Sequence, residues 1–230
     1  MKTLGILITL ALGMLNFSYA QDCSVFVPNK KGSEWEITNY NAKGKAEGST
    51  KYKMVDINSS GSKTTFKIHM TAFDKKGKEL MQNELEAFCD NGNFEFDMSF
   101  FFNEDMMGGM NEMDVDMEME MSSLEMPNFS DPVGTTLEDG LVTVKMDMPG
   151  MGAMEMRFLY TDRKISNRES KTVPAGTFDC IVLDQTLKMK TILEMTINSK
   201  DWYADGIGMV RSETYRKGKL DSYSELTMMK

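Results

Sequence analysis

The feature that most constrains the fold of this chain is its succession of short alternating segments, which turn residues separate about every ten positions. Residues 34–40, Glu-Trp-Glu-Ile-Thr-Asn-Tyr, alternate in polarity and hold the aromatic and β-branched residues that strands favour. Asn91-Gly92 is a strong signal for a tight turn between two strands. The sequence therefore predicts about eleven or twelve strands. The segments with strand character are residues 34–40, 51–57, 64–73, 79–89, 94–100, 114–121, 141–148, 154–160, 164–172, 178–188, 193–199, 202–204, 209–216 and 220–228, and we expect some of the shortest to join a neighbour.

Many short strands without βαβ alternation indicate an all-β sandwich or barrel. We expect one strongly curved antiparallel sheet, a half-barrel or open barrel with little helix, formed by residues 21–230 as a single domain. A chain of this length buries a substantial core. A concave sheet of this kind could also hold an apolar ligand.

The N-terminus has the pattern of a secretory signal peptide. Met1-Lys2 precedes an apolar run over residues 4–17, and Ser18-Tyr19-Ala20 ends with small residues. Cleavage after Ala20 would deliver a periplasmic or secreted protein. No later run is long and apolar enough for a membrane span, and Cys23 is poorly placed for a lipid anchor.

The charge distribution argues against a nucleic-acid partner. The net charge is −9, and residues 79–144 contain seventeen Asp and Glu but no Lys or Arg. The rest of the chain carries a surplus of eight positive charges, since it holds 26 basic and 18 acidic residues. The acidic middle would repel nucleic acid and attract cations, or simply form a solvated face.

Three cysteines, Cys23, Cys89 and Cys180, enter an oxidising compartment after export. Their spacing matches no zinc or thioredoxin-type motif, and the simplest arrangement is one disulfide and one thiol. If the first four strands form a plain meander, Cys89 returns to the sheet end at which the first strand begins. Cys23 lies just upstream of that strand, so we predict a Cys23–Cys89 disulfide and a buried Cys180 thiol.

Catalytic signatures are missing from the sequence. His69 is the only histidine, it lies in the middle of a strand, and no nucleophile elbow or phosphate-binding glycine loop occurs. The acidic residues are abundant, but no pair stands out as an acid–base couple. We expect a protein that is not an enzyme and has no cofactor.

Methionine is unusually frequent, with 24 residues in the chain, and a Met- and acid-rich segment spans about residues 103–126. Thioether ligands suit Cu(I), and Met106, Met107, Met110 and Met113 are the candidates for such a site. Methionine also fills cores and lines apolar binding surfaces, and neither His nor Cys accompanies these residues, so we expect no tight metal site. Strict alternation over residues 114–121 places alternate residues on one face of a strand. The candidate apolar lining comprises Phe100, Met117, Met119 and Met121.

Two C-terminal motifs are similar to a known family. The first is residues 173–180, Val-Pro-Ala-Gly-Thr-Phe-Asp-Cys, and the second is residues 202–213, Trp-Tyr-Ala-Asp-Gly-Ile-Gly-Met-Val-Arg-Ser-Glu. With residues 88–92, they resemble an uncharacterised, TapB-like family of exported β proteins of Bacteroidetes-type envelopes. The resemblance implies a curved antiparallel sheet, no known reaction and no catalytic residues.

Four hypotheses about function remain open. The chain is expected to be an envelope module that binds an apolar ligand or an unknown envelope protein. The alternatives are a Cu(I) binder and a structural envelope protein without a ligand. A hydrolase with an unrecognised site around His69 fits least well.

Overall fold

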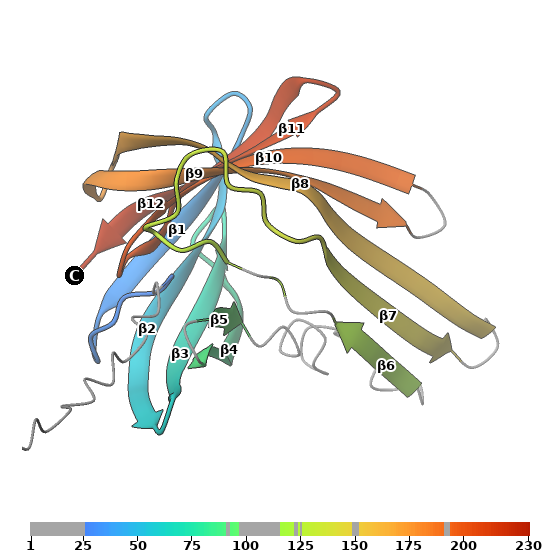
Figure 1. Ribbon diagram of the computed structural model, residues 1–230, viewed down its shortest axis with the longest axis horizontal. Helices are drawn as coiled ribbons and strands as arrows, with labels where there is room; N and C mark the ends of the chain where they lie inside the picture. The colour runs from blue at the N-terminus through green and yellow to red at the C-terminus, as the bar shows by residue number, and fades with distance from the viewer. Residues whose placement is uncertain are drawn as a thin grey trace, which may run out of the picture.

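The computed structural model describes residues 26–90, 93–96, 116–121, 124, 126–148, 152–190 and 194–230. Within these ranges the fold is all-β, as predicted, and twelve strands form one antiparallel sheet (Figure 1). The sheet order is β5-β4-β3-β2-β1-β12-β11-β10-β9-β8-β7-β6. The strands are β1 (Glu34–Asn41), β2 (Ala46–Ser60), β3 (Lys63–Asp74), β4 (Glu79–Asp90), β5 (Asn93–Phe96), β6 (Asp116–Met121), β7 (Gly140–Met148), β8 (Gly152–Val173), β9 (Gly176–Lys190), β10 (Glu194–Ala204), β11 (Gly208–Arg216) and β12 (Lys219–Met229).

The sheet consists of two meanders that meet where the first and last strands pair. Trp35 of β1 lies opposite Met229 of β12, and Thr38 lies opposite Glu225. The first meander ends at edge strand β5 and the second at edge strand β6, and in the described part of the chain these edges do not pair. The sheet therefore curves into two wings without closing into a barrel (Figure 1).

Strand β8 corrects one detail of the sequence prediction. Residues 154–160 and 164–172 were expected to form separate strands, but they belong to one strand of 22 residues. The register with β9 shifts between Thr161 and Lys164 and again between Ile165 and Asn167, and Asp162 has a positive φ of 55°. Irregular backbone at Thr161–Arg163 is thus absorbed as bulges that bend the strand, not as a turn that ends it.

The core lies on the inner face of the curved sheet, where the two wings meet. Phe26 fills the centre of this core and is 3% exposed. Its ring centroid lies 5.6 Å from that of Phe94 in the first wing, 5.4 Å from that of Tyr203 in the second and 4.8 Å from that of Phe129. The segment that leads into β1 therefore stabilises the junction of the wings through aromatic packing.

Residues 126–139, which we name the strap, run across β8 (Figure 1). The Gly134 amide donates to the Ile165 carbonyl at 2.8 Å, and the Leu137 amide donates to the Arg163 carbonyl at 2.9 Å. The Arg163 guanidinium donates to the Glu138 carbonyl at 2.9 Å. These bonds attach the strap to the bulged part of β8, where ladder bonding is interrupted.

No helix that could cross a membrane occurs in the ranges that the structure describes.

Candidate functional site

The inner side of the second wing carries an apolar surface built from cross-strand rows. Residues directly opposite in an antiparallel ladder share a face of the sheet. One row is Val142, Phe158, Met189 and Met195, and a second contains Leu187 opposite Ile197. Val144 lies opposite Met156 in the next row towards the wing tip. We name the described members of these rows the methionine face: Val142, Val144, Met154, Met156, Phe158, Leu187, Met189, Met195 and Ile197.

The edge strand β6 extends these rows. Its register places Met121 opposite Val142, Met119 opposite Val144 and Met117 opposite Met146. The predicted period of two over this segment agrees with the observed strand, and the three methionine positions share the face of Val142 and Val144.

Burial changes across the methionine face. Val144 is fully buried and Val142 is 7% exposed, and the half-buried side chains of Met154, Met156 and Phe158 pack against them. Met195, at the end of its row, is 40% exposed. An apolar surface that stays partly accessible at the rim of an open sheet is a feature of ligand and partner sites.

A belt of polar side chains separates the methionine face from the core; Arg163 and Asp201 are buried, and the other members are half-buried. Along the inner face of β9 the residues run from Ile181 and Leu183 in the interior through Gln185 to Leu187. Gln185 lies opposite Ser199, and Asp201 lies between Leu183 and Ser212. The polar belt comprises Arg163, Gln185, Ser199, Asp201 and Ser212.

Asp201 is the centre of the polar belt and is 4% exposed. It accepts hydrogen bonds from Gln185 Nε2 at 2.9 Å, Ser199 Oγ at 2.8 Å and Ser212 Oγ at 2.5 Å. Three donors satisfy a carboxyl group that would otherwise be costly to bury. Arg163, only 2% exposed, donates from Nε to Gln185 Oε1 at 3.4 Å and so joins the belt to the strap.

Burial dominates the electrostatics of the belt. Desolvation raises the pKa of Asp201 above its usual value, although the three hydrogen bonds oppose this shift. Burial and the neighbouring Asp201 carboxylate raise the pKa of Tyr203, and burial and the same carboxylate raise that of Tyr160. The belt therefore presents hydrogen-bonding groups at the inner end of an apolar surface.

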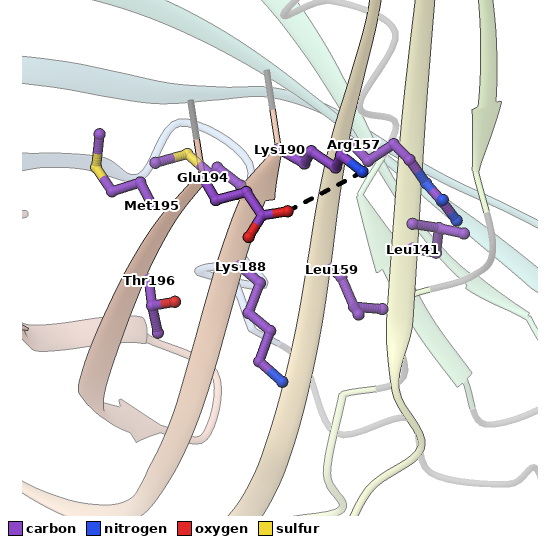
Figure 2. Close-up of a pocket in the computed structure, with 9 residues that line it drawn as sticks. Leu141, Arg157, Leu159, Lys188, Lys190, Glu194, Met195 and Thr196 are labelled. Carbon is purple, nitrogen blue, oxygen red and sulfur yellow. Dashed lines mark ion pairs between the residues drawn. The ribbon is translucent and has the colours of Figure 1, made fainter. Parts of the chain in front are cut away.

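The outer side of the same wing holds a shallow pocket of about 240 Å³, shown in Figure 2. Leu141, Leu159, Lys188 and Thr196 form one cross-strand row of this pocket. Arg157, Lys190 and Glu194 form the adjacent row. These two rows combine two leucines with three basic side chains, and Met189 and Met195 of the methionine face also line the pocket.

Several residues that the sequence singled out lie outside the described residues: Cys23, Phe100, Met106, Met107, Met110 and Met113. The Cu(I) site and the contribution of Phe100 to an apolar lining therefore stay predictions. In the described ranges no group of three His, Cys, Asp or Glu side chains could hold a metal ion.

His69 lies within a strand of the sheet, and Cys180 is buried. His69 Nε2 lies 3.5 Å from Thr71 Oγ1. In the sheet, His69 lies opposite Lys53 of β2 and Glu84 of β4. Cys180 is a buried free thiol, and burial raises its pKa to about 11. Thiolate chemistry at neutral pH is therefore suppressed at Cys180.

Neither the polar belt nor the outer pocket was predicted from the sequence. Asp201 and Arg163 carry no signal in the sequence, because strand periodicity does not show which polar residue the sheet buries. One local signal for the outer pocket exists: Lys188-Met189-Lys190 alternates cations with an apolar residue. Period two sends the two lysines to one face and Met189 to the other.

These features define a class: an open, single-sheet β protein with a partly accessible apolar inner face and no recognisable catalytic constellation among its described residues. The chain belongs to the DUF3108-like family, whose model matches residues 30–226. The comparison does not confirm the TapB-like name. A comparison with curated proteins found no match.

Two crystal structures share the fold. One is a protein from Bacteroides fragilis NCTC 9343 that is predicted to be exported and has a YmcC-like fold. It is 26% identical, covers 90% of this chain and 100% of its own, and has a TM-score of 0.70. The other is a protein from Parabacteroides distasonis ATCC 8503 that is predicted to be a lipoprotein. It is 24% identical, covers 91% of this chain and 100% of its own, and has a TM-score of 0.72.

Proposed function

We propose that this protein is a non-enzymatic, exported envelope protein that binds an apolar ligand on the methionine face. The observation that carries the proposal is the register of β7–β10, which gathers apolar side chains from distant parts of the chain into continuous rows. The outer ends of these rows remain accessible at Met195. Export is supported by the signal-like residues 1–20 and by the description of the Bacteroides fragilis protein as exported.

The composition of the surface favours a flexible apolar chain as the ligand. Methionine has an unbranched, polarizable side chain that adapts to different shapes. The face has no charged member, so an acyl chain could lie along it without burying an unpaired charge. The polar belt marks the inner limit of the face. Leu187 and Ile197 form the last apolar row, and Gln185 and Ser199 form the next row towards the core.

Displacement of a fluorescent fatty acid tests the proposal. Met156 and Met189 lie on the methionine face, and replacing both with Gln keeps the side-chain length but makes it polar. We expect the affinity of Met156→Gln/Met189→Gln to fall on the order of tenfold, since each change removes apolar contact area.

The matched control is Glu155→Gln, because Glu155 precedes Met156 and lies on the opposite face of the same strand, across from Lys145. It should leave the affinity unchanged. Wild-type protein that binds no fatty acid, or a double variant that binds as well as wild type, would refute the proposal.

A further inference from the structure

We infer that the outer pocket of the second wing is a contact site for an anionic lipid surface. This inference concerns the basic rows of the pocket, which lie on the face opposite to Met156 and Phe158, and it does not depend on ligand binding to the methionine face. It rests on the row geometry, the unbalanced charge and the small, open shape of the pocket.

The rows place apolar side chains directly beside cations. Leu141 lies opposite Leu159, and Leu159 lies opposite Lys188. In the adjacent row Arg157 lies opposite Lys190. Figure 2 shows Leu159 between Lys188 and Leu141, with Arg157 above the two leucines. An apolar patch with long basic side chains around it fits the boundary between lipid headgroups and acyl chains.

The positive charge of the pocket is only weakly neutralised by the protein. Arg157 Nε is 3.8 Å from Glu155 Oε1, and Lys190 Nζ is 4.0 Å from Glu194 Oε1. Both pairs are at least half exposed, so water and salt screen them. Lys188 is exposed, and in the described part of the chain no acidic side chain lies within ion-pair distance of it. Phosphodiester groups are complementary to such a surplus.

The size of the pocket favours contact with a membrane surface over enclosure of a small molecule. Its volume of about 240 Å³ is below the roughly 300–1,000 Å³ of pockets that enclose a drug-sized molecule. Arg157, Lys188, Lys190 and Glu194 are all exposed. A bilayer can meet the whole row at once, and each cation adds attraction to an anionic leaflet.

Vesicle co-sedimentation of the full chain tests the inference. The vesicles are pure phosphatidylcholine and an equal mixture of phosphatidylcholine with phosphatidylglycerol. Wild type should bind only the anionic vesicles, and binding should weaken with salt. Arg157→Gln/Lys188→Gln should lower the partition coefficient on the order of tenfold, because two cations are lost from the contact. Leu159→Gln should also lower it.

The charge-matched control is Lys75→Gln/Lys76→Gln, which removes two exposed lysines from the loop between β3 and β4 and should retain wild-type binding. Met154→Gln/Met156→Gln should retain it as well, because both residues lie on the methionine face and neither lines the pocket, which separates this site from the methionine face. No binding to anionic vesicles, equal loss in the control, an unaffected Leu159→Gln, or displacement by inorganic phosphate would each overturn the inference.

Discussion

Gly208 is the position at which one added methyl group should disturb the fold most clearly. It begins β11 with a φ of +94°, and its backbone packs against the segment that carries Phe26. An added Cβ would lie far inside van der Waals distance of the Phe26 carbonyl oxygen and 3.1 Å from the carbonyl carbon. These are backbone atoms, so no flexible side chain can move aside.

The expected loss of folding stability in Gly208→Ala follows from comparison with Gly206, two residues earlier. Gly206 also has a positive φ, +64°, but a Cβ there would meet its nearest atom, Asn29 Nδ2, at 3.8 Å. Gly206→Ala should therefore cost only the conformational penalty of an L residue, about 1–2 kcal/mol. Gly208→Ala should cost this penalty plus overpacking, about 1–3 kcal/mol more. Complete displacement of Phe26 sets an upper limit of about 3–5 kcal/mol.

Urea unfolding followed by tryptophan fluorescence measures this difference, since Trp35 and Trp202 are 6% and 4% exposed. Gly208→Ala should also speed hydrogen exchange and proteolysis in residues 26–33, which Gly206→Ala should not. Equal destabilisation of the two variants, within about 0.5 kcal/mol, would show that the close approach of Gly208 to Phe26 does not stabilise the fold.

Three further predictions follow from buried groups. Burial raises the pKa of Asp201, so the native state binds this proton more tightly than the unfolded chain. The carboxyl's contribution to stability is then complete below the unfolded-state pKa of about 3.9 and is lost as the pH rises through the higher folded-state pKa; urea titrations should show this decline in wild type and not in Asp201→Asn. Cys180, with a pKa raised to about 11, should react with iodoacetamide only after unfolding, and rapid labelling of the native protein would contradict its burial. Peptide mapping without reduction should link Cys23 to Cys89, and replacing Cys89 with Ser should cost about 2–4 kcal/mol; a peptide that joins Cys180 to either residue would disprove this pairing.

The predicted disulfide illustrates how far local reasoning extends. The meander that the argument required is present, since β1 to β5 follow one another in the sheet. Cys89 is buried and lies opposite Phe94, and Phe94 contacts Phe26, three residues after Cys23. Cys23 itself is outside the described residues, so the bridge stays a prediction that this arrangement supports.

Strand β8 shows a limit of prediction from local sequence, since residues 154–160 and 164–172 were predicted as two strands but form one. Residues near Thr161 break the alternation, and a turn is the usual reason for such a break. The long partner strand β9 instead continues past residues 161–163, and it pairs with β10 on its other side. Strand β8 therefore stays paired with β9 before and after two bulges. Whether a break becomes a turn or a bulge depends on the neighbouring strand, which periodicity within one segment cannot reveal.

The sequence by itself determined the all-β class, most strand positions and the alternation of methionine with acidic residues in β6, because these depend on side-chain period and turn chemistry within a few residues. Only the tertiary structure decided that Asp201 is buried, that Lys188 and Leu159 share an outer pocket, and that Met156 and Met189 share an inner face. The reason is that register across strands is set by bulges and long-range pairing, and a shift of one residue would send every side chain to the opposite face.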